Sequence, residues 1–271
     1  MSLFDHHIHS SRSDGRVSLE DRARSVAIRP HGISDHYPWH DGMRSDDDVL
    51  AYLDDAARLG LRVGIEYDLG VAPPLRRTTR DALDYVIGSV HGIGSRPDRI
   101  EYSAAGQFLK DRGTATFRDH ARFADPALQR RILERHLALV REGILETGID
   151  IVGHPTFTPL AALGDPEAGY PVEWQERFIS LCVEHDVAIE LNEAYGVPHR
   201  ELLVRAHRQG ARFSVGSDTH FALGPLDRTH AMIAEAALPA ERFLAGRRPE
   251  PGPPRTSASR AAKVNPGSPP R

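Results

Sequence analysis

Seven short β-like runs recur along the chain, and helix-like stretches separate most of them. Several runs are almost continuously apolar, which is typical of strands that are buried on both faces of a sheet. Strands that alternate with helices predict βα units and a parallel sheet. Seven such units favour an α/β barrel over an open sheet. The runs cover residues 2–9, 31–36, 61–67, 85–91, 149–154, 187–192 and 212–218.

The helix-like stretches have recognisable ends. Ser18 and Asp21 have the spacing of a capping box at the start of the first stretch. Pro126 opens a clearly amphipathic stretch. From residue 92 to about 125 the pattern is irregular, and we expect this long excursion to be a lid and specificity loop. The predicted helices cover residues 18–28, 46–59, 126–146, 172–185 and 199–209.

The chain has 271 residues, a length at which an α/β barrel commonly forms one domain. After residue 246 the composition changes to Pro, Arg and Ser, with almost no apolar side chains. Such a segment cannot bury enough apolar surface to offset the entropy that it would lose on ordering. We therefore expect a barrel domain over residues 1–246 and a disordered tail over residues 247–271.

Composition excludes several classes of protein. The net charge of −4 argues against a dedicated nucleic-acid-binding protein, because phosphate backbones favour a basic surface. Cys182 is the only cysteine, which excludes an intramolecular disulfide and fits a reducing compartment. The N-terminus lacks a signal-peptide pattern, and no apolar run has membrane-spanning length. These features predict a soluble, cytoplasmic protein without a membrane partner.

Side chains that can bind metals stand at the ends of six of the seven runs. The carboxyl ends of parallel barrel strands meet at one mouth, where barrel enzymes build their active sites. Within each His-x-His or Asp-x-His pair, both side chains point the same way because side chains alternate along a strand. The remaining run ends at Asn192, with Glu190 two residues earlier. The groups at the six ends are His7 and His9, Asp35 and His36, Glu66, His91, His154, and Asp218 with His220.

Histidine and carboxylate ligands together suit zinc, iron or manganese. A catalytic zinc ion usually has three protein ligands and a water, so nine candidates predict two or three divalent ions rather than one. Glu66 and Asp218 are then candidates to bridge ions and to act in catalysis. Clusters of this kind favour hydrolysis, above all of phosphate esters, by a metal-bound hydroxide. A single histidine at a strand end is usually structural, but six strand ends in register argue against coincidence.

In their order along the chain, these residues resemble the motifs of the PHP family (polymerase and histidinol phosphatase). The similarity covers about residues 1–245. Two features depart from it: the stretch 29–32 shortens the second run, and the tail matches nothing in the family. The matching motifs are Asp5-His6-His7-Ile8-His9-Ser10, Ser13-Asp14-Gly15, Ser34-Asp35-His36, Gly64-Ile65-Glu66, Gly88-Ser89-Val90-His91, His154-Pro155 and Gly216-Ser217-Asp218-Thr219-His220.

The resemblance implies a distorted seven-stranded (β/α)7 TIM-like barrel that holds a three-metal cluster. By analogy with the family, three groups of side chains hold the ions. The first group is His7, His9, Glu66 and Asp218, the second is Glu66, His91 and His154, and the third is Asp14, His36 and His220.

The leading hypothesis is a metal-dependent phosphoesterase of the histidinol-phosphatase type, which hydrolyses a small-molecule phosphate monoester. A metal-bound hydroxide is expected to attack phosphorus in line, without a covalent phosphoenzyme. An arginine is expected to bind the non-bridging oxygens. The candidates are Arg200, after the sixth run, and Arg118 or Arg122, in the excursion.

Two other functions stay open. A nuclease or oligonucleotide phosphodiesterase of the same family would need a basic groove, which the net charge of −4 argues against. A degenerate metal-binding barrel without catalysis would lack ligands, yet none is missing from the motifs. An amidohydrolase bridged by a carboxylated lysine is disfavoured, because no lysine lies near a strand end.

Overall fold

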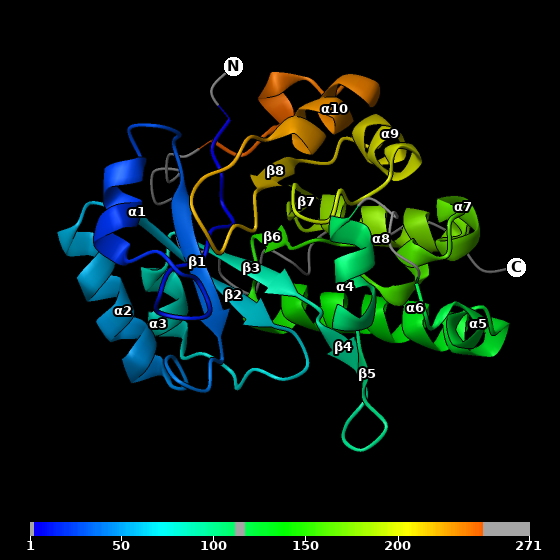
Figure 1. The fold of residues 1–271 in the computed structure, drawn as a ribbon, viewed down its shortest axis with the longest axis horizontal. Coiled ribbons are helices and arrows are strands. Elements are labelled where there is room, and N and C mark those ends of the chain that lie inside the picture. Colours follow the sequence, from blue (N-terminus) through cyan, green and yellow to red (C-terminus); the bar gives the residue numbers. More distant parts are fainter. Residues whose placement is uncertain (1–2, 112–116, 246–271) are drawn as a thin grey trace, which may run out of the picture.

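A curled parallel sheet of six strands forms the centre of the protein (Figure 1). The computed structural model describes residues 3–111 and 117–245. The strands are β1 (Gly32–Tyr37), β2 (Arg62–Asp68), β3 (Tyr85–Ser89), β6 (Ile151–Val152), β7 (Ala188–Asn192) and β8 (Phe213–Gly216). They lie in this order in the sheet, with helices outside it. This arrangement is an α/β half-barrel, which is consistent with a TIM-like barrel.

The prediction of seven strands is wrong in number, because the first predicted strand, residues 2–9, forms no continuous ladder over its described residues, 3–9. It runs between the two edge strands and makes isolated parallel bridges to both sides. Side chains take backbone N–H groups that a regular ladder would use: Asp5 accepts from His7 N, and the Ser34 hydroxyl accepts from Ile8 N. The bridges join Asp5 to His31, Asp5 to Val215, and Ile8 to Thr219.

The second predicted strand, residues 31–36, forms at its predicted length and is shifted by one residue. β1 has six residues and pairs with β2 from Gly32–Arg62 to Tyr37–Tyr67. This register places His36 beside Glu66 at the carboxyl end of the two strands. The short stretch 29–32 therefore does not displace His36 from the mouth of the barrel.

Side chains alternate between the two faces of the sheet. Ile33, Ile65 and Ile189 belong to the main hydrophobic core, which lies between the sheet and the helices. The opposite face of the same strands carries Ser34, Glu66 and other small or polar residues, as the period of two requires. Beneath them lies a separate small apolar cluster of Tyr85, Ile87, Ile151 and Ala188. The inner face thus supplies a polar barrel mouth above a thin apolar floor.

The predicted helices all form. They are α1 (Leu19–Ser25), α2 (Asp46–Arg58), α6 (Pro126–Glu142), α8 (Val172–Glu184) and α9 (Arg200–Arg208). Ser18 caps α1 by accepting a hydrogen bond from Asp21 N, as its spacing predicts. After α6 the chain continues as a π-helical turn, Gly143–Thr147, and Gly148 caps the end of this turn. Gly148 has a φ of 72°, which glycine adopts at low cost.

The irregular excursion contains ordered elements that its sequence pattern does not reveal. β4 (Gly92–Ile93) and β5 (Ile100–Glu101) pair as an antiparallel hairpin, followed by α4 (Ser103–Lys110) and α5 (His120–Phe123). Strands of two residues and a helix of four are too short to produce a periodic signal. The other elements are α3 (Arg77–Ala82), α7 (Pro166–Gly169), α10 (Asp227–Glu235) and the 3₁₀ turns Pro159–Ala162 and Ala240–Arg242.

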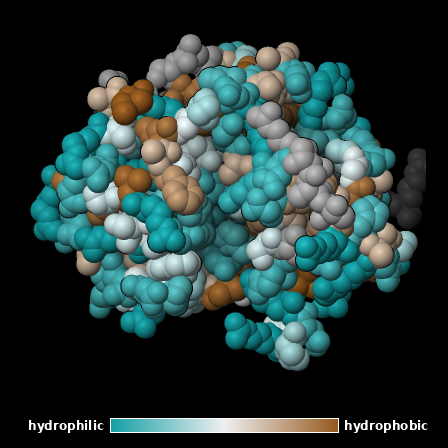
Figure 2. All heavy atoms as spheres, viewed as in Figure 1, coloured by the Kyte–Doolittle hydropathy of each residue, from teal (hydrophilic) through white to brown (hydrophobic). Residues whose placement is uncertain are grey.

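The surface seen in Figure 2 is mainly hydrophilic and is hollowed near its middle. No helix within residues 3–111 and 117–245 is long and apolar enough to cross a membrane. The tail predicted for residues 247–271 lies outside the described residues.

Candidate metal centre

Glu66 lies at the centre of a cluster of histidines and carboxylates. Its side chain is 1% exposed, although an isolated buried carboxylate would be costly. Oε2 of Glu66 lies 3.3 Å from His7 Nε2, 3.6 Å from His9 Nε2 and 2.8 Å from His36 Nδ1. Oε1 lies 3.2 Å from His91 Nε2 and 3.0 Å from His154 Nε2. One buried carboxylate therefore faces five imidazoles from four segments of the chain.

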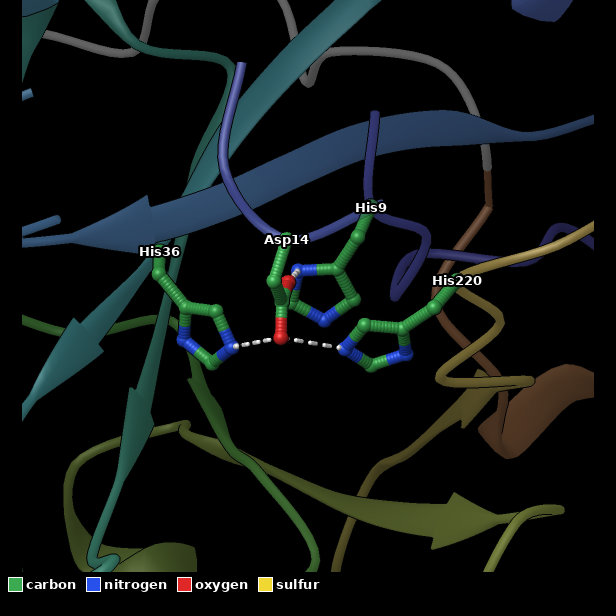
Figure 3. A group of neighbouring side chains, drawn as sticks. All are labelled: His9, Asp14, His36 and His220. Atoms are coloured by element: carbon green, nitrogen blue, oxygen red, sulfur yellow. Dashed lines mark ion pairs between the residues drawn. The ribbon is translucent and has the colours of Figure 1, made fainter. Parts of the chain in front are cut away.

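A second group, Asp14, His36 and His220, meets beside His9, and its side chains point toward one another (Figure 3). Oδ2 of Asp14 lies 3.0 Å from His220 Nε2 and 3.6 Å from His36 Nε2. Oδ1 of Asp14 lies 3.7 Å from His9 Nδ1. Asp218 completes the cluster, with its Oδ1 atom 3.4 Å from His9 Nε2.

The structure thus brings all nine predicted ligands together, each within 3.4 Å of another member. Three sets have their ligand atoms within 4.8 Å of one another, and the sets share members. The division of ligands among individual ions stays a prediction. The sets are His9, Asp14, His36 and His220; His7, His9 and Glu66; and His36, Glu66 and His91.

Two of the ligand positions have an unusual backbone. His154 has a φ of 25° and Asp218 a φ of 53°, which non-glycine residues rarely adopt. Such conformations persist where the surroundings fix them, and they concentrate at functional sites. At Asp218, backbone hydrogen bonding supplies this constraint, because its N–H donates to His7 O at 2.7 Å.

Other polar side chains hold the loops that carry the ligands. Asp35, which precedes His36 in β1, accepts hydrogen bonds from the backbone N–H of Ser10 at 2.7 Å and from the Ser13 hydroxyl at 2.6 Å. This fixes the loop that leads to Asp14. Arg22 of α1 is 1% exposed. Its guanidinium donates to His9 O at 2.7 Å and 3.0 Å.

Two carboxylates that the sequence motifs do not include approach histidine rings of the cluster. Glu190 Oε1 lies 2.7 Å from His7 Nδ1, and Asp68 Oδ1 lies 3.4 Å from His91 Nδ1. The alternation of side chains along a strand could have identified them from the sequence, because Glu190 shares a face of its strand with Asn192, and Asp68 shares one with Glu66. Sequence reasoning noted Glu190 but gave it no role.

Charges within the cluster shift the pKa values of its members. Burial would raise the pKa of Glu66, but His36, His7 and His91 hold it well below its usual range. Burial would lower the pKa of His91, but Glu66 and Asp68 raise it to about 9. The pKa of His9 is lowered to about 4, by burial and by the nearby His36. Ionised carboxylates and a neutral His9 are forms that bind divalent metals.

Several buried atoms of the cluster make no hydrogen bond with any part of the described chain. Buried polar atoms in proteins normally have partners, so this group needs an explanation. Imidazole nitrogens and carboxylate oxygens are the donors that zinc, iron and manganese accept. The donor set therefore fits divalent metal ions. The atoms are Nε2 of His7, both ring nitrogens of His9 and Nδ1 of His154.

The three arginines predicted to bind phosphate lie elsewhere. Arg200 begins α9, is exposed, and donates to Glu235 O and to Glu201. Arg118 is exposed in the excursion, and Arg122 lies over the ring of Phe123. Among contacts between residues that the structure describes, none joins these arginines to the cluster, and their role stays a prediction.

Sequence relatives of the chain are phosphatases by name. No protein-family model matches the sequence. A 120-residue segment is 30% identical to a protein from Aeromonas hydrophila named "Probable phosphatase", and covers 41% of this chain and 44% of that protein. A relative of the same name from Shewanella loihica is 28% identical over 134 residues, which is 46% of this chain and 50% of that protein. The chain thus spans about half the length of the curated relatives it matches.

The fold is similar to that of a histidinol phosphate phosphatase from Lactococcus lactis, whose structure contains zinc, L-histidinol and phosphate. The TM-score is 0.56 at 18% identity, over 87% of this chain and 94% of that one. A second solved structure, from Listeria monocytogenes, gives 0.57 at 15% identity, over 85% of this chain and 98% of that one. The chain is thus similar in fold to a histidinol phosphate phosphatase, and in sequence to relatives named as phosphatases. These similarities confirm the resemblance to the PHP family.

Proposed function

We propose that this protein is a metal-dependent phosphoesterase of the histidinol-phosphatase type, which hydrolyses a small-molecule phosphate monoester. The observation that carries the proposal is Glu66, a buried carboxylate that faces five imidazoles. The phosphatase names of the sequence relatives and the fold shared with a histidinol phosphate phosphatase support it.

Three groups of side chains, two of which share Glu66, would hold the ions in this proposal. Bound divalent ions supply positive charge for phosphoryl oxygens and lower the pKa of a coordinated water. A site of this kind needs no nucleophilic side chain. The groups are His7, His9, Glu66 and Asp218; Glu66, His91 and His154; and Asp14, His36 and His220.

The two proposed catalytic carboxylates are held in different ways. The two oxygens of Glu66 face different histidines, so that one side chain can serve two ligand groups. Oδ2 of Asp218 accepts a hydrogen bond from Asn192 Nδ2 at 3.3 Å. This contact directs Oδ1 toward His9 and limits rotation of the carboxylate. Preorganised charge of this kind needs no rearrangement during the reaction.

An aromatic wall beside His154 is our candidate for binding the organic part of the substrate. The Phe157 and Tyr195 rings stack at 4.0 Å and lie 5.1 Å and 5.9 Å from the His154 ring. The ammonium of Lys110, at the end of α4, lies 5.1 Å from the centre of the Tyr195 ring. Lys110 contacts Tyr195, and Tyr195 contacts His154 of the cluster, whereas none of the three predicted arginines has such a connection among the described contacts. Through Lys110, the excursion would contribute to substrate specificity.

A phosphatase screen with zinc, manganese and iron tests the proposal. The substrates are histidinol phosphate, sugar phosphates, nucleotides and a short oligonucleotide. We expect metal-dependent release of phosphate from at least one monoester, and we expect Asp218→Asn to abolish it. His230→Ala, an exposed histidine on α10, is the matched control and keeps full activity.

Other outcomes separate the alternatives. Cleavage of the oligonucleotide alone, with an affinity that falls steeply with salt, indicates a nuclease. Tight metal binding without hydrolysis of any substrate indicates a metal-binding barrel that lacks catalysis. Undiminished turnover of Asp218→Asn with added metal contradicts the assignment of the cluster as the active site.

A further inference from the structure

Glu190 is a buried carboxylate that lies behind the cluster, outside the sequence motifs. It is 0% exposed on the inner face of β7. Oε1 lies 2.7 Å from His7 Nδ1, while the other ring nitrogen of His7 faces Glu66 at 3.3 Å. Oε2 accepts hydrogen bonds from His154 N and from Asn192 Nδ2. One carboxylate therefore contacts two of the predicted ligands from the side opposite to Glu66.

The neighbouring strand leaves space for this contact. A Cβ atom added at Gly216 of β8 would lie 2.0 Å from Glu190 Oε1 and 2.7 Å from His7 Cβ. Any side chain at position 216 would therefore separate the carboxylate from the ring. The contact between Glu190 and His7 thus explains physically why position 216 of the Gly216-Ser217-Asp218 motif is glycine.

We propose that Glu190 is a positioning residue for His7. Its carboxylate holds Nδ1 as a hydrogen-bond donor and so leaves Nε2 free to bind a metal ion. Histidines that bind metals commonly donate their other ring N–H to a carboxylate, which fixes the tautomer and the orientation of the ring. The inference rests on the proposed metal cluster. It adds a residue that does not bind the metal itself.

The variant Glu190→Gln keeps the shape of the side chain but removes its charge and replaces one acceptor oxygen with an NH2 group. Three donors converge on Glu190: His7 Nδ1, His154 N and Asn192 Nδ2. In Glu190→Gln, the amide oxygen best serves the two donors at the Oε2 position. The NH2 group then faces His7 Nδ1, which must become an acceptor. The proton moves to Nε2, and this nitrogen can no longer bind a metal ion.

Asp150→Asn is the matched control. Asp150 accepts hydrogen bonds from Val86 N at 2.8 Å and from Arg80 at 2.6 Å. It precedes β6, at the end of the strand opposite to the barrel mouth. The same change from carboxylate to amide therefore lowers stability without reaching a ligand ring.

The experiment titrates metal-free wild type, Glu190→Gln and Asp150→Asn with zinc against a chromophoric chelator, and records cobalt(II) absorption spectra. We expect zinc affinity to fall about 10- to 100-fold in Glu190→Gln and to stay unchanged in Asp150→Asn. The cobalt spectrum should change in the first variant only. If Glu190→Gln does not fold, Glu190→Asp replaces it, because the shorter side chain withdraws from His7 and keeps the charge.

Unchanged zinc affinity in a folded position-190 variant overturns the inference, and so does an equal loss in Asp150→Asn. The proposed function fails separately. Wild type that binds zinc but hydrolyses no phosphomonoester contradicts the phosphatase assignment, while a weaker zinc site in Glu190→Gln still supports the role of Glu190.

Discussion

Glu66 combines complete burial with five imidazole neighbours, so it affects the cluster more than any single histidine does. Each histidine contacts one to three carboxylates, whereas Glu66 contacts five histidines, which come from the N-terminal segment, from β1 and from the loops after β3 and β6. Loss of its charge therefore disturbs most of the ligand groups at once.

Glu66→Gln should lower zinc affinity and metal-dependent hydrolysis by at least about 100-fold. Changes next to metal ligands already cost about 10- to 100-fold, and a residue that contacts several ligands directly should cost more. Chelator competition and the phosphatase assay measure the two effects. Glu134→Gln, an exposed glutamate of α6 that pairs with Arg177, is the control. A Glu66→Gln variant with wild-type zinc affinity contradicts the central position of Glu66.

His136 makes the fold sensitive to acid. Burial, with a smaller effect of His154, lowers its pKa to about 3, whereas an unfolded histidine titrates near 6.5. Between these values the unfolded chain binds a proton that the folded protein does not, so stability is full above pH 6.5 and is lost as pH falls. From pH 7 to pH 5 the loss from this group is about 2 kcal/mol.

His136→Gln, which is neutral at every pH, should remove this contribution. Denaturant unfolding of metal-free protein at pH 7 and pH 5 measures it. We expect wild type to lose about 2 kcal/mol more than the variant over this range. Equal losses in the two proteins would show that His136 does not bind a proton selectively in the unfolded chain.

At this scale the sequence predicted which side chains gather in the cluster, and the physical reason is local. His7 and His9, like Asp218 and His220, are two residues apart, so an extended backbone alone directs both side chains of a pair to one side. Glu190 and Asp68 are different. Their roles depend on which ring nitrogen lies opposite them, and this depends on the packing between strands that are distant in sequence.

Among the elements, α1 connects the two segments that flank the edges of the sheet. Arg22 of α1 donates to His9 O in the N-terminal segment, and to Thr219 O, at 3.3 Å, in the loop after β8. Both acceptors are backbone carbonyls next to or within ligand motifs. A helix on the outside of the barrel thus fixes two ligand-bearing segments that form only isolated bridges with their neighbours.

Arg22→Lys should lower the free energy of unfolding by about 3 kcal/mol. A lysine cannot reproduce the forked geometry of the guanidinium, and it leaves buried carbonyls without donors. Arg24→Lys, on the exposed side of the same helix, should change stability by less than about 0.5 kcal/mol. Urea unfolding monitored by circular dichroism compares them. Similar losses in both variants would assign the effect to the helix rather than to the contacts of Arg22.

The elements show where sequence periodicity stops being informative. Helices such as α2 and α6 were predicted because 13 and 17 residues repeat an apolar pattern over several turns. The segment 2–9 reads as a strand by the same rule. Its ladder is interrupted because the side chains of Asp5 and Ser34 accept hydrogen bonds from its backbone N–H groups, in place of carbonyls of a neighbouring strand. No residue pattern within the segment reveals these contacts.

On the scale of the whole molecule, the cluster joins distant parts of the barrel. Its predicted ligands come from the N-terminal segment, from β1 and β2, and from the loops after β3, β6 and β8. Metal ions that bind these ligands would connect segments separated by most of the chain. Any group that binds the folded chain but not the unfolded one stabilises the fold, by an amount that grows with the logarithm of its free concentration relative to Kd.

Metal loading should therefore raise the stability of the whole domain. At a free zinc concentration of about 100 times Kd, one ion adds about 2.7 kcal/mol. For a chain of this size that corresponds to a rise in Tm of roughly 5 to 10 °C. Thermal unfolding of the metal-free protein, with and without zinc, measures the shift, and a chelator should reverse it. Glu66→Gln should respond far less, because its zinc affinity is lower. A shift of equal size in Glu66→Gln would assign the effect to zinc bound elsewhere, and no shift in wild type would contradict metal binding by the cluster.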